Sequence, residues 1–373
     1  MKKIFAAILA VIFSLLVLGG CSGVGGQSLR ILSGSENREL EPVLAEFTKR
    51  TGVKVEMSYK GSIDIMNELR SGVSDYDAVW PANSIWIAMG DDNKVVKHEK
   101  SIMSSPIVFG LRKSLAQSLG FVGRQISVKD ILTATENGTL RFAMTSATQS
   151  NSGACAYLGF LSAMLDKNTP VTAGDLQNAD LQADVKKLLS GVNRSSGSSD
   201  WLKELLVENP DSFDAMVNYE SLVIAANMEL TAKGKEPLYI IYPYDGMSLS
   251  DSPLGYVGKG GSAKEEAFLK LQEYLLSDAV QKNLNDLGRR TGITLDIENP
   301  DPKVWNKDWG VDTERTLSFI NLPPKEVIFE ALNLYQTALK KPSATVYCLD
   351  YSGSMSDSGN EQLVEAMHTI LDQ

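Results

Sequence analysis

The chain has 373 residues, of which 43% are hydrophobic and 22% are charged. This is ordinary globular usage, and it excludes a mainly disordered, collagen-like or coiled-coil protein. Acidic residues outnumber basic ones by 46 to 36, and a net charge of −10 repels phosphate backbones, so we expect no nucleic-acid partner. Two histidines and three cysteines without a CxxC spacing argue against His-rich zinc or haem sites and against a disulfide framework.

The N-terminus carries the pattern of a secretory leader. An apolar run over residues 4–18 follows two lysines and ends shortly before Cys21. The run is shorter than the ~20 residues that span a membrane, so it fits a signal peptide, although an uncleaved anchor helix is the alternative. Its ending, Leu-Gly-Gly-Cys, resembles the lipobox of bacterial lipoproteins. The resemblance implies a signal peptide over residues 1–20, a lipidated Cys21, a tether over residues 21–28, and a lipid-anchored protein on the extracytoplasmic face of the membrane.

From residue 29 onward, short apolar runs alternate with amphipathic segments, which predicts α/β layers. Each helix in the first part of the chain follows a strand and a polar turn that contains Ser or Asn. Helix starts expose unpaired N–H groups, and the carboxyl ends of parallel strands share one sheet edge, so these turns predict a polar cleft. The alternative is that the turns are ordinary N-caps. The predicted strands are 29–32, 53–57 and 77–80, and helices follow from residues 40, 62 and 84.

The densest group of hydroxyls and amides lies over residues 145–153, between an apolar strand and a helix of small residues. Because buried donors without partners are unfavourable, we expect this turn to meet a ligand. The alternative is a loop whose Ser and Thr side chains satisfy one another.

Other segments give weaker signals. The Gly/Ser-rich stretch 195–199 is expected to be a linker between two helices, and the charged stretch 91–100 an exposed surface. A polar turn over residues 288–292 contains two arginines that could meet an anion. Cys155 and Cys348 lie in apolar surroundings and are expected to be buried thiols.

Together these pieces resemble bacterial extracellular solute-binding proteins of the type II periplasmic-binding class. The resemblance covers residue 29 to about 330 and rests on SGSENRELEPVLAEFTKRTG, YKGSIDIMNELRSG, DYDAVWPANSIWI, SPIVFGLRKSLAQSLG, FAMTSATQSNSGA, VNYES and PLGYV. It implies a module over residues 28–335 with two α/β lobes, a hinge and a cleft that closes on a ligand. We place the crossings near 106–111 and 243–256, lobe one at 28–105 with 254–335, and lobe two at 106–253.

The resemblance also implies the cleft residues. The solute would be small and polar, with anions among the candidates, and would be held by hydroxyls, amides and backbone N–H groups. A nucleophile with a general base is not apparent, so we do not expect an enzyme. The candidate residues are Ser33, Ser35, Ser62, Asn83, Ser84, Thr145, Ser146, Ser150, Asn151, Ser152, Tyr219 and Arg290.

The last part of the chain has a different pattern. A predicted strand over 344–349 leads into Asp350, Ser352 and Ser354, and a predicted helix over 360–371 follows. This DxSxS segment resembles the first metal-binding segment of von Willebrand factor A domains, which implies a Mg²⁺ or Mn²⁺ site and a protein partner. The alternative is an Asp-led turn that caps a helix.

Residues 343–373 are too few for the whole domain, so we expect only its incomplete start and an incomplete metal site. Two functions follow as alternatives. Either the protein captures or senses a solute and carries an interaction domain, or it is a surface adhesion or assembly protein whose two lobes are only a scaffold.

Overall fold

The computed structural model describes residues 27–72, 75–258, 261–292, 295–314, 316–342, 347–356 and 358–371. The predicted signal peptide (1–20) and Cys21 lie outside these residues, so the lipid anchor stays a prediction. Within the described ranges, no helix combines the length and apolar character needed to cross a membrane. The chain forms two units, a large one that ends at Lys340 and a small one over residues 341–373.

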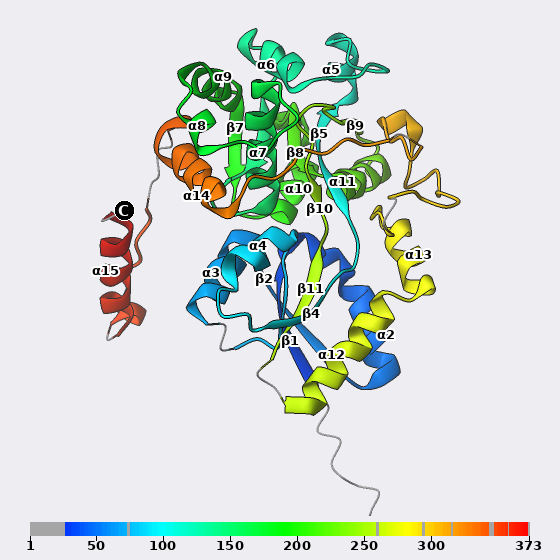
Figure 1. Cartoon of the computed structure of the whole chain (residues 1–373), viewed down its shortest axis with the longest axis vertical. Helices are drawn as coiled ribbons and strands as arrows, with labels where there is room; N and C mark the ends of the chain where they lie inside the picture. The colour runs from blue at the N-terminus through cyan, green and yellow to red at the C-terminus, as the bar shows by residue number, and fades with distance from the viewer. Residues whose placement is uncertain are drawn as a thin grey trace, which may run out of the picture. The chain divides into compact units, whose positions relative to one another are not determined.

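The first lobe of the large unit contains a five-stranded sheet in the order β2-β1-β3-β11-β4 (Figure 1). β1 pairs in parallel with β2 and β3, whereas β11 is antiparallel to β3 and β4. Successive side chains of a strand point to opposite faces, so Ile31 packs with Phe47 and Phe268 on one face while Leu32 packs with Ile65 on the other. The strands are β1 (Ser28–Gly34), β2 (Lys54–Lys60), β3 (Ala78–Trp80), β4 (Val96–Ser101) and β11 (Pro253–Val257). The helices are η1 (Ser35–Leu40), α2 (Glu41–Thr51), α3 (Ser62–Ser71), α4 (Ser84–Gly90), α12 (Gly261–Leu275) and α13 (Asp278–Asp286).

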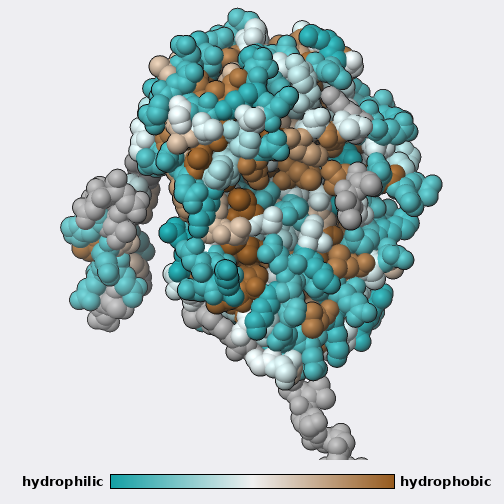
Figure 2. All heavy atoms as spheres, viewed as in Figure 1, coloured by the Kyte–Doolittle hydropathy of each residue, from teal (hydrophilic) through white to brown (hydrophobic). Residues whose placement is uncertain are grey.

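The second lobe contains a six-stranded sheet in which β10, β5, β8, β6 and β7 follow one another and β9 also pairs with β5. Successive residues of β5 again enter different cores, since Phe109 packs with Phe160 and Val108 packs with Val223. On the face that Figure 2 shows, hydrophilic residues cover most of the two lobes. The strands are β5 (Ser105–Arg112), β6 (Phe142–Thr145), β7 (Val192–Ser196), β8 (Ala215–Tyr219), β9 (Leu238–Ile241) and β10 (Leu249–Ser250). The helices are α5 (Lys113–Ser118), α6 (Val128–Glu136), α7 (Asn151–Leu165), α8 (Ala173–Leu176), α9 (Ala179–Ser190), α10 (Ser199–Glu208), η2 (Pro210–Ser212) and α11 (Glu220–Ala232).

The chain crosses between the lobes at short segments. The first crossing, 102–104, joins β4 to β5, and the second, 251–252, joins β10 to β11. The predicted location 106–111 is instead part of β5, inside the second sheet, whereas the predicted range 243–256 contains the second crossing. Both of these crossings are only a few residues long and lie directly between strands of different sheets, which is the arrangement of a hinge. A third passage, between α13 and Trp305, returns the chain from the first lobe to the second.

After α13, the observed boundary between the lobes differs from the predicted one. The sequence prediction placed residues 254–335 in lobe one, but Trp305 and Trp309 pack in a core of the second lobe with Val223. Further on, Tyr335 contacts Tyr157 of α7 with ring centroids 5.2 Å apart. Large aromatic side chains bury much apolar surface, and these three bury it against the second lobe, so this part of the chain belongs to that lobe. The elements concerned are η3 (Lys307–Trp309), α14 (Lys325–Leu334) and η4 (Tyr335–Leu339).

The small unit contains a short turn of helix, η5 (Gly353–Met355), and α15 (Ser358–Leu371), which agrees with the expected helix over 360–371. Residues 347–349, at the end of the predicted strand, have no regular structure, and residues 344–346 lie outside the described ranges. Cys348 is exposed, contrary to the prediction, whereas Cys155 is buried. A strand needs a hydrogen-bonded neighbour to become buried, and the described part of this unit provides none.

Candidate functional site

The predicted turns of the first lobe lie at the carboxyl ends of β1, β2 and β3. Ser33 Oγ accepts a hydrogen bond from Asn37 Nδ2 at 3.1 Å, and Ser62 Oγ accepts one from the backbone N–H of Ala82 at 3.0 Å. The bond from Ala82 to Ser62 joins the turn after β3 to the turn after β2. Ser35 is buried at the edge of a groove of about 710 Å³ that residues from both lobes line.

Asn83 and Ser84 connect the start of α4 to the second lobe and to the second crossing. Asn83 Oδ1 caps the helix by accepting from the Ile85 N–H at 3.0 Å, while its Nδ2 donates to the Leu249 carbonyl at 2.8 Å. The Ser84 N–H donates to Asp251 Oδ1 at 2.9 Å. The N-cap interpretation therefore holds for Asn83, which also forms an interlobe contact.

Asn151 joins the two lobes at the start of α7. Its Oδ1 accepts from Trp86 Nε1 of the first lobe at 2.7 Å. Its Nδ2 donates to Tyr219 Oη at 3.1 Å and to Ser250 Oγ at 2.8 Å. All four side chains are buried, so they form a closed polar contact between the lobes.

The hydroxyls of the 145–153 turn mainly satisfy one another. Thr145 Oγ1 lies 2.8 Å from Ser152 Oγ, which lies 2.7 Å from Ser199 Oγ, and Ser150 Oγ lies 3.0 Å from the same Ser199 hydroxyl. Ser146 is half-buried and bonds Thr148. Hydrogen bonds among hydroxyls therefore account for these side chains, as the alternative interpretation expected. The hydroxyl that connects Ser150 and Ser152 belongs to Ser199, which the sequence did not indicate because Ser199 begins α10, far along the chain.

Arg290 lies in a buried ion pair rather than on an open surface. Its Nε and Nη2 donate to the two carboxylate oxygens of Glu220 at 2.7 and 2.8 Å, and its Nη1 donates to the Leu295 carbonyl at 2.9 Å. Tyr242 also donates to Glu220. A buried carboxylate needs a counter-charge, and Arg290 supplies it to Glu220. Arg290 is therefore not free to bind an anionic solute, contrary to our expectation.

A small cavity of about 20 Å³ lies where the lobes and both crossings meet. Tyr219 is the only predicted site residue among its lining side chains. Most of the lining residues have polar side chains, including serines from each crossing and from the second lobe, but the surface that they expose to the cavity is mainly apolar. The lining residues are Glu36, Ala82, Met103, Ser104, Ser105, Tyr219, Ser221, Ser250, Ser252 and Arg289.

Glu36 is the most unusual group of this cavity. Its side chain is buried, and its Oε1 has no hydrogen-bond donor among the described residues. Burial raises the pKa of Glu36 to about 7, against the opposing effects of a hydrogen bond from its own main chain and of Arg289. The sequence does contain a signal, because Gly34 has no Cβ and a Cβ there would lie 2.0 Å from Glu36 Oε1. Glycine at this position therefore allows the carboxyl group to fold back beside β1.

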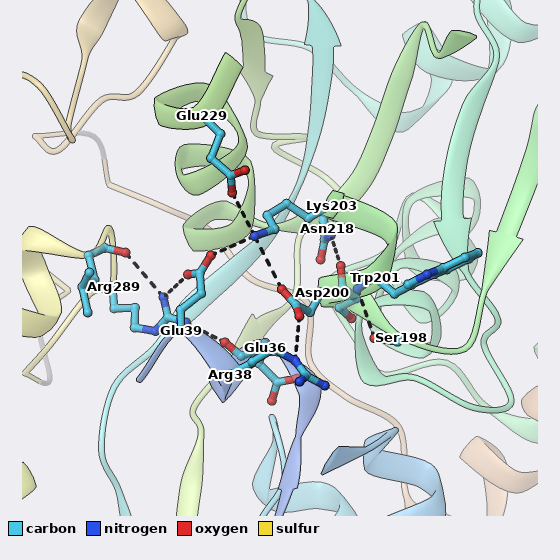
Figure 3. A network of polar contacts seen from close by, with 12 residues as sticks. Glu36, Arg38, Glu39, Ser198, Asp200, Trp201, Lys203, Asn218, Glu229 and Arg289 are labelled. Atoms are coloured by element: carbon cyan, nitrogen blue, oxygen red, sulfur yellow. Dashed lines mark hydrogen bonds and ion pairs between the residues drawn. The ribbon is translucent and has the colours of Figure 1, made fainter. Parts of the chain in front are cut away.

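An interlobe ion-pair network lies next to Glu36 (Figure 3). Arg38 Nε lies 3.0 Å from Asp200 Oδ2, and Lys203 Nζ lies 3.4 Å from Glu39 Oε1. Arg289 Nη1 donates to Glu39 Oε2 at 3.3 Å, while its Nη2 donates to the main-chain carbonyl of Glu36 at 2.6 Å. Because Arg38 and Glu39 belong to η1 while Asp200 and Lys203 belong to α10, these pairs hold the two lobes together.

The predicted metal segment of the small unit forms an Asp-led turn. Asp350 Oδ1 accepts from the Ser352 N–H at 2.8 Å, and this hydrogen bond lowers the pKa of the exposed carboxyl. The side chain of Ser354 lies outside the described atoms. In the part of the chain that the structure describes, no three His, Cys, Asp or Glu side chains are grouped closely enough to hold a metal ion. One carboxylate and hydroxyls fit part of a Mg²⁺ site, not a complete one.

Two α/β lobes joined at short crossings, with a cavity between them that residues of both lobes line, define a hinged binding protein. A comparison with known families agrees, since residues 29–290 match the model described as "Bacterial extracellular solute-binding protein". The chain belongs to this bacterial extracellular solute-binding protein family. A comparison with curated proteins finds no match.

Solved structures share the two-lobe fold at low sequence identity. The chain is similar to the sulfate-binding protein SubI from Mycobacterium tuberculosis H37Rv, with 18% identity, a TM-score of 0.54, and coverage of 83% of this chain and 97% of that one. It is similar to the periplasmic binding protein AfuA from Actinobacillus pleuropneumoniae, with 10% identity, a TM-score of 0.57, and coverage of 84% and 98%. It is also similar to the ferric binding protein from Campylobacter jejuni, with 16% identity, a TM-score of 0.56, and coverage of 83% and 98%.

Proposed function

We propose that this protein captures a small polar solute between its two lobes without transforming it. The observation that carries the proposal is the cavity that both lobes and both crossings line with polar side chains. About 20 Å³ has room for little more than a water molecule, so a larger solute enters only when the lobes separate at 102–104 and 251–252. The fold neighbours support a small solute, since their descriptions name sulfate, fructose-6-phosphate and ferric iron.

Native mass spectrometry of the protein, purified without denaturation from its own source, tests this function. A retained small molecule that leaves on unfolding would establish a solute receptor and give the mass of the solute. A bare protein mass, together with no thermal shift across a broad panel of metabolites, would contradict solute capture. That outcome would favour the alternative, a surface adhesion or assembly protein in which the two lobes are a scaffold.

We expect Tyr219→Phe to weaken binding of the retained solute about fivefold. The substitution removes a cavity hydroxyl that also accepts a hydrogen bond from Asn151, and one hydrogen bond is worth about 1 kcal/mol. Isothermal titration calorimetry measures the change. Tyr256→Phe is the matched control, because Tyr256 is equally buried in the core of the first lobe and its Oη has no partner among the described residues. Equal affinities of the two variants would place the solute elsewhere.

We further propose that Cys21 carries the lipid that anchors the protein on the extracytoplasmic face of the membrane. The lipobox-like sequence supports this, as does the extracellular family to which the chain belongs. Incorporation of a labelled fatty acid that is lost in Cys21→Ser tests the anchor. Labelling that persists in this variant would contradict it.

Residues 343–373 are proposed to begin a von Willebrand factor A domain that binds a protein partner through Mg²⁺ or Mn²⁺. The support is the order of Asp350, Ser352 and Ser354 followed by α15. Mg²⁺ titration of the full-length gene product tests the site. An unchanged affinity for Mg²⁺ in the Asp350→Ala variant would contradict the proposed metal site.

A further inference from the structure

Two buried acceptor oxygens of η1, one of them on a residue that lines the cavity, lack donors among the described residues. Glu36 is 8% exposed and Asn37 is fully buried, and neither Glu36 Oε1 nor Asn37 Oδ1 has a hydrogen-bond partner among the described residues. Buried polar atoms are nearly always paired, so each such atom calls for an explanation. Both belong to η1, immediately after β1, and Glu36 lines the cavity. For the ionised carboxylate of Glu36, what is missing at this point is therefore a hydrogen-bond donor.

The charges around Glu36 do not supply that donor. Arg289 is occupied by the Glu36 main-chain carbonyl and by the Glu39 carboxylate. Asp200, across the cleft, adds a second negative charge that acts on Glu36. The remaining polar groups of the cavity are Tyr219 and serine hydroxyls. The cavity thus presents a carboxyl group whose cationic neighbour is engaged elsewhere (Figure 3).

We propose that the solute carries a protonated amine, which lies against Glu36 and donates to its Oε1. This inference rests on the proposed function and names the substrate class of the same site. An ammonium group supplies up to three donors and a positive charge, and its hydrogen bonds to a carboxylate are among the strongest in proteins. The serine hydroxyls then bind the neutral polar part of the solute.

The same groups disfavour the other solute classes. A sulfate-like anion would meet the Glu36 carboxylate at close range, where like charges repel strongly in a site of low dielectric constant. A metal ion needs several strong ligands, and in the described ranges no three His, Cys, Asp or Glu side chains form such a group. A neutral polyol could bond the serines but would leave the Glu36 charge without a counter-charge.

The pKa of Glu36 gives the proposal a pH signature. Burial raises this pKa to about 7, Arg289 lowers it and Asp200 raises it, while Tyr219 is the other titratable group that interacts with Glu36. An amine binds the ionised carboxylate, of which about one tenth is present at pH 6 and about nine tenths at pH 8. We therefore expect amine affinity to rise about tenfold between these two pH values.

The test compares thermal shifts of the full chain with three sets of probes. Ethanolamine and putrescine represent protonated amines, erythritol represents neutral polyols, and sulfate and phosphate represent anions. We expect the amines alone to raise the unfolding temperature, and Glu36→Gln to weaken their binding ten- to a hundredfold. Glu46→Gln is the matched control, because Glu46 is partly exposed on α2 and its ion-pair partners among the described residues are Lys49 and Arg50. Equal unfolding temperatures of Glu36→Gln and the wild type at pH 5 show that the variant is folded.

The outcomes separate this inference from the function on which it rests. Stabilisation by sulfate or phosphate, or by erythritol alone, would overturn the amine and leave solute capture standing. If none of the probes binds, the molecule retained in native mass spectrometry decides: an amine supports the inference and any other class overturns it. If no molecule is retained and no probe binds, the proposed function fails and this inference fails with it.

Discussion

Replacing Arg290 with methionine is expected to lower the free energy of unfolding by about 3–5 kcal/mol. Arg290 is 1% exposed and its partner Glu220 is fully buried. The variant leaves the Glu220 carboxylate in the interior with only Tyr242 as a remaining donor of those described. Breaking one side of a buried ion pair is costly because the other charge stays desolvated.

Urea unfolding of the solute-free protein measures this effect. Lys282→Met is the matched control, because it removes a lysine from an exposed pair with Asp286 and should change stability by no more than about 0.5 kcal/mol. The double variant Glu220→Gln/Arg290→Met should recover part of the loss, since it contains no lone buried charge. If Arg290→Met were as stable as the Lys282→Met control, the ion pair would not be a main support of the second lobe.

The second large effect concerns the pH dependence of stability at Glu36. The folded-state pKa of about 7 is higher than the ordinary value of 4.5, so between these values the folded protein binds more protons than the unfolded chain. Stability therefore falls as the pH rises from 4.5 through 7, and the loss is about 3 kcal/mol once the pH is well above 7. Glu36→Gln removes this contribution because the amide does not titrate.

Urea unfolding at pH 5 and pH 8, in the absence of solute, measures the difference between wild type and Glu36→Gln. The stability of the variant relative to the wild type should increase by about 2.5 kcal/mol between the two pH values. Comparing the two proteins cancels the titration of other carboxyl groups, and Glu46→Gln, which alters an exposed carboxyl, serves as control. Parallel pH profiles of wild type and Glu36→Gln would show that Glu36 is not titrating in this range.

The α/β layers were predictable from the pattern of the sequence, and the two-lobe arrangement followed from the family resemblance. The apolar run 29–32 lies within β1, and the helical spacing over 40–49 lies largely within α2. Such elements bury one face or both, so the periodicity of their apolar residues records their conformation. The family match over residues 29–290 agrees with the resemblance that these elements carried.

Edge strands were the main elements that the sequence analysis missed. The stretch 195–199 was expected to be a linker, but Ser195 and Ser196 pair with β6 as part of β7. The charged stretch 91–100 was expected to be an exposed surface, and its end forms β4, the outermost strand of the first sheet. Edge strands face solvent and often carry charged side chains, so they lack the apolar alternation that reveals a strand.

The cleft was only partly predictable from the sequence. Local sequence was sufficient to indicate that polar turns follow the strands of an α/β protein, because capping and periodicity depend on near neighbours. Which polar groups are left for a solute depended on partners far along the chain. Ser199 hydrogen-bonds Ser150 and Ser152, and Glu220 pairs with Arg290, whereas Glu36 Oε1 has no donor in the described part of the chain. Only the folded chain brings these distant groups together. Whether a buried polar or charged group is satisfied depends on the partner that lies beside it in the tertiary structure.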